Sequence, residues 1–238
     1  MGGYMQIFIG IILPLVGTIL GSLMILIFKN VEGKLYRLLS GIACGVMLSA
    51  VFFSFITPAI DIVSDNPLGC IGITLAFLFG FFLLQIFDLI FGKNKNIGQI
   101  AFIVHNIPEG FSSGVALVGI ASGNSVFAST SILISIGIAI QNIPDGAIAS
   151  LNSLLDGNTK RKSIIFGITT GLVEPLAAIL AMILVNFITP IIPFVYSVSA
   201  GVIIYVIVDE LIPNSKGVFG NLGFGFGFSI IMILNLIL

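Results

Sequence analysis

Long apolar segments alternate along this chain with short polar connections. Eight of the apolar segments approach or exceed the ~20 helical residues that cross the hydrocarbon core of a bilayer. The predicted spans are 5–28, 36–60, 69–91, 98–120, 126–152, 163–187, 191–212 and 218–238. Because the connections are short, the pattern predicts an all-α polytopic membrane protein that forms one transmembrane domain, residues 1–238.

Composition supports the same class of protein. The chain is 58% hydrophobic and only 8% charged, whereas soluble proteins carry about 25% charged residues. A soluble domain of this composition could not cover its surface. No basic run indicates nucleic acid as a partner, and the expected partner is the lipid bilayer. The two cysteines, Cys44 and Cys70, lie in apolar surroundings and form no disulfide framework.

The basic residues predict the orientation. All nine lie in or beside odd-numbered connections: Lys29, Lys34, Arg37, Lys93, Lys95, Lys160, Arg161, Lys162 and Lys216. Cytoplasmic loops are enriched in Lys and Arg, so the odd connections are predicted to be cytoplasmic and both termini extracytoplasmic. Asp61 then lies in an outer connection.

A polar motif occurs twice within these apolar segments. Residues 105–110 read His-Asn-Ile-Pro-Glu-Gly, and residues 141–146 read Gln-Asn-Ile-Pro-Asp-Gly, 36 residues later. In the first copy, His105, Asn106 and Glu109 share a helix face because they are three or four residues apart. Imidazole, carboxylate and amide oxygen are ligands of divalent cations. A charged side chain at mid-membrane costs ~2.5–3.5 kcal/mol and usually marks a ligand site or pathway.

Three acidic residues are predicted to lie at one depth. Glu109 is 14 residues from Lys95, Asp145 is 15 from Lys160, and Glu174 is 12 from Lys162. At ~1.5 Å per residue, each acid lies ~18–23 Å from the cytoplasmic lysines, near mid-membrane. Three carboxylates at one level repel each other unless a cation or protons join them. Each acid also adjoins a proline, which frees a backbone carbonyl one turn earlier.

These motifs resemble those of the ZIP family of divalent metal-ion transporters. The family carries a motif like residues 105–110 in its fourth helix, a similar motif in the fifth, and Glu-Pro in the sixth, as at Glu174-Pro175. The resemblance implies eight helices in a 3+2+3 arrangement, with both termini outside a plasma membrane. It also implies a mid-membrane binuclear metal site. The implied site residues are His105, Asn106, Glu109, Gln141, Asn142, Asp145 and Glu174.

Two other stretches are similar to the same family. Residues 44–54 resemble its second helix, which implies that Met47 contacts the metal and that Ser54 and Asp61 line the outer entrance. Residues 199–213 resemble its seventh helix and imply that Asp209 and Glu210 lie near the cytoplasmic exit. The implied function is inward transport of Zn²⁺, with Cd²⁺, Fe²⁺ or Mn²⁺ as alternatives. A homodimer is also implied as a possibility.

The chain departs from the family pattern in two places. Gln141 and Asp145 stand where many members have His and Glu, so the site has one imidazole fewer and one shorter carboxylate. This change is expected either to weaken one metal position or to favour harder ions such as manganese or iron. The third connection, 92–98, has no histidine-rich tract, so we expect no metal-sensing loop there.

Structural alternatives exist for the individual residues. The single histidine could be a hydrogen-bonded core residue, Asn106 and Asn142 could only bond between helices, Gln141 could be a spacer, and Met47 could be ordinary packing. Asp88 is more typical of a solvated acid. The alternative function is an intramembrane metal-dependent hydrolase. Such an enzyme usually needs two or three imidazoles around a retained metal, and one histidine fits that need poorly.

Overall fold

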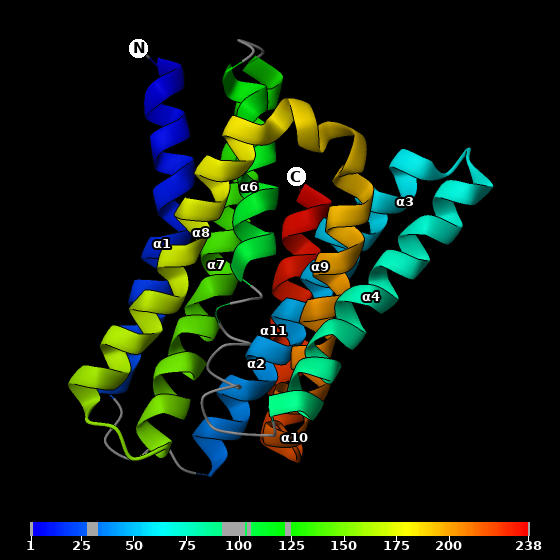
Figure 1. Ribbon diagram of the computed structural model, residues 1–238. Helices are drawn as coiled ribbons and strands as arrows, with labels where there is room; N and C mark the ends of the chain where they lie inside the picture. The colour runs from blue at the N-terminus through cyan, green and yellow to red at the C-terminus, as the bar shows by residue number, and fades with distance from the viewer. Residues whose placement is uncertain (1, 28–32, 92–102, 104–105, 122–124, 238) are drawn as a thin grey trace. The chain divides into compact units, whose positions relative to one another are not determined.

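The computed structural model describes residues 2–27, 33–91, 103, 106–121 and 125–237, and within these ranges the regular structure is helical, without strands (Figure 1). Six of the helical stretches are long and apolar enough to cross a membrane. They are Gly3–Ile27, Lys34–Val63, Pro67–Ile90, Lys160–Val185, Ile192–Asn214 and Val218–Leu236. The prediction of an all-α, multi-pass membrane protein is thereby confirmed. The 3+2+3 arrangement and the extracytoplasmic termini stay predictions.

Counted as continuous helical stretches, the helices agree with the predicted spans to within a few residues, apart from the span 98–120. The longer helices are α1 (Gly2–Ile27), α2 (Lys34–Ala50), α4 (Pro67–Phe91), α6 (Asn106–Ala121), α7 (Ser125–Leu155), α8 (Lys160–Ile188), α9 (Ile192–Val206) and α11 (Val218–Ile237). Shorter elements are η1 (Val51–Ile56), α3 (Thr57–Val63), η2 (Thr189–Ile191), η3 (Ile207–Leu211) and α10 (Ile212–Asn214). The structure describes only the later part of the predicted span 98–120.

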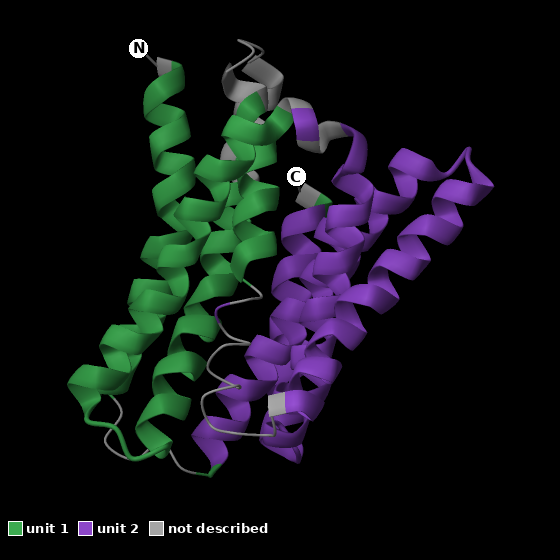
Figure 2. Ribbon diagram, viewed as in Figure 1, with its two compact units in different colours: residues 1–33, 106–185, 236–238 green, residues 34–105, 186–235 purple. Residues whose placement is uncertain are grey.

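The chain divides into two compact units, shown in different colours in Figure 2. Unit 1 comprises residues 1–33, 106–185 and 236–238, and it contains α1, α6, α7 and α8. Unit 2 comprises residues 34–105 and 186–235, with the remaining helices. Each unit therefore combines helices from distant parts of the sequence. The expectation of a single transmembrane transporter domain stays a prediction.

Glycines bring the helices of unit 1 into backbone contact. A Cβ added at Gly17 or at Gly21 of α1 would lie 2.0 Å from a carbonyl oxygen of α7, that of Ala139 or Ile143. On α7, a Cβ at Gly146 would lie 2.2 Å from the Thr18 carbonyl oxygen of α1. Small residues at helix interfaces permit this close approach in membranes, where lipid tails compete equally for apolar surface. The first helix is therefore fixed against the second motif helix.

Unit 2 is built around α9, which packs against α3, α4 and η1. Glycines again provide the close contact, because a Cβ at Gly80 of α4 or at Gly201 of α9 would lie 2.1 Å from a carbonyl oxygen of the opposite helix. The rings of Phe55 in η1 and Tyr196 in α9 meet edge to face, with their centroids 6.0 Å apart. These contacts form the core of the second unit.

Two helices of unit 2 contain a π-helical turn where the sequence predicted an uninterrupted span. In η1 and η3 the chain widens just before a proline, and the Thr57 N–H then bonds the Phe52 carbonyl while the Ile212 N–H bonds the Ile207 carbonyl. Both bonds reach back five residues. Pro58 and Pro213 cause this, because a proline has no N–H and its ring clashes with the carbonyl four residues earlier.

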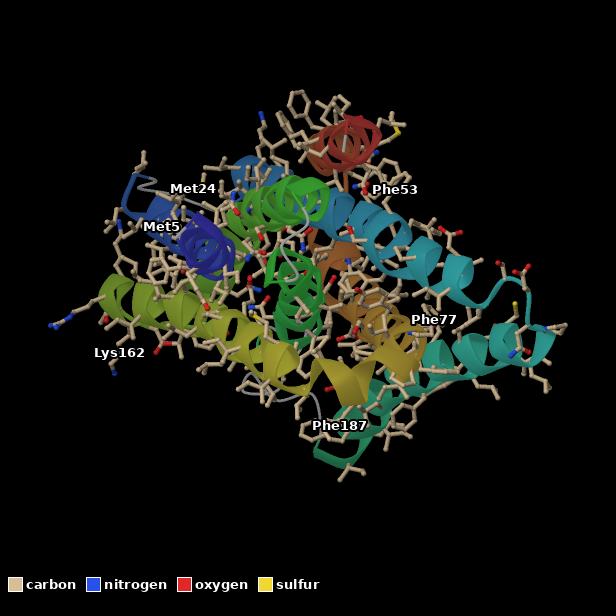
Figure 3. The ribbon with its side chains drawn as sticks, turned by 90° about the horizontal axis from the view of Figure 1, so that it is seen from above. Met5, Met24, Phe53, Phe77, Lys162 and Phe187 are labelled. Carbon is tan, nitrogen blue, oxygen red and sulfur yellow. The ribbon has the colours of Figure 1, made fainter. Side chains whose placement is uncertain are left out.

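Three basic residues mark the beginning of α8 in unit 1. Lys160, Arg161 and Lys162 are all solvent-exposed. Figure 3 shows the Lys162 side chain directed outward from its helix. Lysines at helix ends reach the polar headgroup layer with their long side chains, so this end of α8 fits a membrane–water interface.

Candidate metal-ion site

The three acidic residues that the sequence placed at one depth all belong to unit 1. Glu109 lies in the first turn of α6, Asp145 within α7 and Glu174 within α8. Their exposed fractions are 1%, 5% and 2%, so all three are buried. They lie near enough for Glu109 to interact electrostatically with both of the others, and for Asp145 to interact with Glu174. The structure therefore brings the three acids into one cluster.

A glycine lies beside each acid and lets the neighbouring helix approach. Gly110 follows Glu109, and a Cβ there would lie 2.4 Å from the Glu174 carbonyl oxygen of α8. Gly146 follows Asp145 and faces α1, as described above. Gly171, one turn before Glu174, faces the Thr18 side chain, which a Cβ would meet at 2.7 Å. The glycines thus explain how four helices can meet at the level of the carboxylates.

The two asparagines of the motif bond between helices through their amide nitrogens. The Asn106 Nδ2 donates to the Thr170 carbonyl of α8 at 2.8 Å. The Asn142 Nδ2 donates to the Glu174 carboxylate at 2.7 Å and to the Pro14 carbonyl of α1 at 3.2 Å. Since a backbone carbonyl only accepts hydrogen bonds, the Thr170 and Pro14 carbonyls each hold an asparagine amide with its nitrogen toward them. The amide nitrogens of Asn106 and Asn142 therefore make interhelical hydrogen bonds, as the structural alternative for these two residues proposed.

Most of the side-chain oxygens of the two asparagines and the three acids have no donor among the described residues. Seven buried oxygens lack a hydrogen-bond partner there: Asn106 Oδ1, Glu109 Oε1 and Oε2, Asn142 Oδ1, Asp145 Oδ1 and Oδ2, and Glu174 Oε1. Buried polar atoms are nearly always satisfied in proteins, so a cluster of unsatisfied acceptors needs an explanation. Carboxylate and amide oxygens gathered in this way suit a divalent cation.

Gln141 lies beside this cluster. Its side chain is buried and lies near the Glu109 carboxylate, although no hydrogen bond of ordinary geometry reaches either carboxylate oxygen. Gln141 is thus placed next to the acids, as the motif predicted. Its role as a ligand rather than a spacer stays a prediction.

The three carboxylates do not by themselves form a metal-binding group. Over the described part of the chain, no group of three or more His, Cys, Asp or Glu side chains is arranged to hold a metal ion. His105, the imidazole of the predicted site, lies outside the described residues, as do the connection 92–98 and the Val104 carbonyl. Amide oxygens therefore have to contribute beside the carboxylates if a cation binds here.

The other predicted residues belong to unit 2. Met47 is completely buried in α2. Ser54 lies in η1 and is partly exposed, whereas Asp61 in α3 is exposed. Asp209 and Glu210 lie in η3, are partly exposed, and each has interaction partners. The metal contact of Met47 and the pathway roles of the other four stay predictions.

Sequence reasoning missed three contributions. The carbonyls of Pro14 and Thr170 hold the asparagine amides. The sequence could not single them out, because every residue carries a backbone carbonyl. A signal that could have identified the contact of α1 is the pair Gly17 and Gly21, which lie four residues apart on one helix face. In unit 2, Asp88 accepts a short hydrogen bond from the Tyr205 hydroxyl of α9, so this acid has a protein partner as well as partial exposure.

Comparison with known proteins gives relatives of one kind. The chain is 24% identical to the zinc transporter GufA of Myxococcus xanthus, over 92% of this chain and 93% of the relative. It is 26% identical to the zinc transporter ZIPB of Bordetella bronchiseptica, over 92% of this chain and 76% of the relative. It is 32% identical to the zinc transporter ZIP11 of Xenopus tropicalis, over 57% of this chain but only 42% of that longer protein. None of the protein-family models matches the chain.

Proposed function

We propose that this chain, which belongs to the ZIP family of metal-ion transporters, carries divalent transition-metal ions across a membrane, with Zn²⁺ as its main substrate. Cd²⁺, Fe²⁺ and Mn²⁺ are the alternative substrates. The bacterial relatives that match almost the whole chain are both named zinc transporters. We place the transport site at the cluster of Glu109, Asp145 and Glu174.

One observation supports this proposal above the others. Three carboxylates are buried together in helices of a membrane protein, and five of their six oxygens lack a donor among the described residues. Leaving such groups ionised and unpaired in a low-dielectric region is costly. A divalent ion that passes through the cluster would neutralise two charges and satisfy several oxygens at once.

The proposed ligand set is that predicted from the motifs. It consists of His105, Asn106, Glu109, Gln141, Asn142, Asp145 and Glu174, with Met47 as a further contact. Ser54 and Asp61 would line the outer entrance, and Asp209 and Glu210 the inner exit. Transport would run inward across the plasma membrane, and two copies of the chain could form a homodimer.

Uptake into proteoliposomes tests the proposal directly. Purified protein is reconstituted, and the entry of Zn²⁺, Cd²⁺, Mn²⁺ and Fe²⁺ is compared with protein-free liposomes. We expect metal entry that saturates with concentration, fastest for zinc. Asp65→Asn is the matched control, because this acid is exposed and outside the proposed path. Uptake no faster than in protein-free liposomes would refute the transport function.

Cysteine labelling tests the orientation. In a background in which Cys44 and Cys70 are replaced by Ser, Gly3→Cys should react with an impermeant reagent on intact cells, and Lys160→Cys should not. Both positions are exposed in the structure. The reverse pattern would exchange the proposed entrance and exit.

Dialysis distinguishes the carrier from the intramembrane hydrolase. A transport site must release its ion, so bound zinc should exchange readily against a chelator. A hydrolase would retain metal stoichiometrically with an open position for an activated water. The relatives described above are named as transporters, which favours the carrier.

A further inference from the structure

We infer that Asn142 is a positioning residue for Glu174, held in place by the Pro14 carbonyl of α1, and that the edge it shares with Glu174 is closed to cations. The inference rests on the proposed function only in taking the acidic cluster as the ion site. It assigns a role at that site to α1, a helix without any ionisable side chain except Tyr4 near its start.

The geometry is a bridge across three helices. One amide group, on α7, donates to a carboxylate oxygen of α8 at 2.7 Å and to a backbone carbonyl of α1 at 3.2 Å. Asn142 and Glu174 are 1% and 2% exposed, so water does not compete for these bonds. Hydrogen bonds in a low-dielectric setting are electrostatically stronger than hydrogen bonds in water. The bridge therefore fixes the Glu174 carboxylate.

The direction of the amide follows from the chemistry of its partners. The Pro14 carbonyl can only accept, so it must meet the nitrogen of Asn142, and the same nitrogen donates to Glu174 Oε2. A carboxylate at position 142 would place an acceptor against two acceptors. The Pro14 carbonyl thus favours an amide at this position over an acid.

The amide hydrogens also decide where an ion can bind. Glu174 Oε2 already accepts a hydrogen bond from the Asn142 amide. A cation placed between the two side chains would be repelled by the partial positive charge on the amide hydrogens. Asn142 Oδ1 and Glu174 Oε1 remain without a donor among the described residues. We therefore place the ion on the side of these two oxygens and not between the residues.

Close packing explains why α1 can serve as the support. The contacts of Gly17 and Gly21 with α7 lie on either side of the level of Thr18, whose carbonyl meets Gly146. A methyl group at Gly17 would overlap the Ala139 backbone and force the two helices apart. Because the Pro14 carbonyl belongs to the same helix, such a shift would lengthen its bond to Asn142.

The first test counts ions. Detergent-solubilised wild-type protein and Asn142→Asp are titrated with Zn²⁺ alone by calorimetry, and the bound metal is counted by elemental analysis. We expect the variant to bind one more zinc ion per chain than the wild type, because the new carboxylate and Glu174 form an edge that attracts a cation. Equal stoichiometry and equal affinity in the two proteins would overturn the inference.

The second test displaces α1, which carries the Pro14 carbonyl, without changing any residue of the acidic cluster. Gly17→Ala should weaken zinc binding by about 10- to 100-fold, the usual loss when the partner of a ligand is disturbed. Gly137→Ala on α7 is the matched control, because a Cβ there meets nothing within 4 Å. Wild-type affinity in a correctly inserted Gly17→Ala protein would contradict the role of α1.

The third test uses a chelator and so does not depend on metal binding or transport. Asn142→Asp should lower the melting temperature of the metal-free protein, and adding Glu174→Gln should recover part of the loss, because a donor and an acceptor then face each other again. Asn142→Asp with Glu109→Gln removes the same charge but not at the bridge, and should recover less. No loss in the single variant, or equal recovery in both double variants, would refute the bridge. Wild-type protein that binds no zinc would refute the proposed function alone.

Discussion

Three buried acidic residues of unit 1 and the acidic residues of unit 2 differ in how their oxygens are satisfied. Glu109, Asp145 and Glu174 in unit 1 are buried, and only one of their six oxygens has a hydrogen-bond donor among the described residues. In unit 2 the acids are exposed or partly exposed, and those in α4 and η3 have protein partners. Both units have helices long and apolar enough to cross a membrane, so membrane burial alone does not explain the difference.

The difference indicates which acids need an ion. An exposed acid is stabilised by water, and an acid such as Asp88 is stabilised by a hydroxyl group. A buried acid without a donor gains most from a bound cation or a proton. We therefore expect substitutions in unit 1 to affect metal binding far more than substitutions of acids in unit 2.

The largest effect is expected at Glu109. Glu109→Ala removes the carboxylate that interacts with both other acids. Zinc uptake should fall by more than ~100-fold, beyond the usual loss for a residue that only supports a ligand. Uptake by proteoliposomes measures the effect.

The control for this substitution comes from unit 2. Asp88→Asn keeps a side chain that can pair with Tyr205 and should retain most of the uptake. Similar loss in both variants would mean that the two units do not differ as proposed. Normal zinc uptake by a correctly inserted Glu109→Ala protein would show that Glu109 of α6 does not belong to the transport site.

A change of pH should separate the two groups of acids. Protons and metal ions compete for the same oxygens in unit 1, so binding must release any protons held there. Zinc affinity should fall as the pH is lowered from ~7.5 to ~5.5, by up to about tenfold per pH unit for each proton displaced. Calorimetry in buffers of different ionisation enthalpy counts these protons.

The pH experiment also tests whether the buried acids of unit 1 differ from the more exposed acids of unit 2. Asp209→Asn should leave the slope of affinity against pH unchanged, because Asp209 is partly solvated. A count of zero protons for the wild type would mean that the acids of unit 1 stay ionised without metal. They would then be solvated or paired in solution.

A smaller effect is expected from restoring an imidazole. Gln141 lies next to Glu109, and Gln141→His should tighten zinc binding by about tenfold, or ~1.4 kcal/mol. Manganese should gain less, because imidazole suits zinc better than manganese. Competition titrations with the two metals measure the ratio, and an unchanged ratio would favour Gln141 as a spacer.

The smallest effect is expected at η3. Asp209→Asn and Glu210→Gln should each lower the uptake rate by less than ~10-fold and should leave zinc affinity unchanged, because partly exposed charges act on the rate of ion passage. Initial uptake rates and calorimetry on the same protein give both quantities. A loss of affinity equal to that of Glu109→Ala would place η3 in the binding site.

The sequence predicted the helices and the grouping of the three buried acids of unit 1, for a physical reason. Span length and apolar composition are local properties, and the predicted span 126–152 lies within α7 at Ser125–Leu155. The spacing of Glu109, Asp145 and Glu174 from the lysines predicted a shared depth, and the structure brings the three acids together. Their roles as ligands stay predictions.

The partners of these groups could not be read from the sequence. The bond from Asn142 to Pro14 joins residues 128 positions apart, and no local pattern specifies which carbonyl an amide will meet. The spacing of Gly17 and Gly21 is visible in the sequence, but it does not specify which helix they contact. The bond between Tyr205 and Asp88 depends equally on the pairing of two distant helices.

The π turns of η1 and η3 affect how the sequence of this chain aligns with the sequences of its relatives. A π turn contains one residue more than the α-helical turn that it replaces, so each turn corresponds to an inserted residue. The insertion rotates everything that follows by about 100° around the helix axis. A helical wheel drawn continuously from Met47 through Ser54 to Asp61 therefore assigns Asp61 to the wrong face. An alignment of this chain with a relative that lacks the bulge would need a one-residue gap between positions 51 and 56.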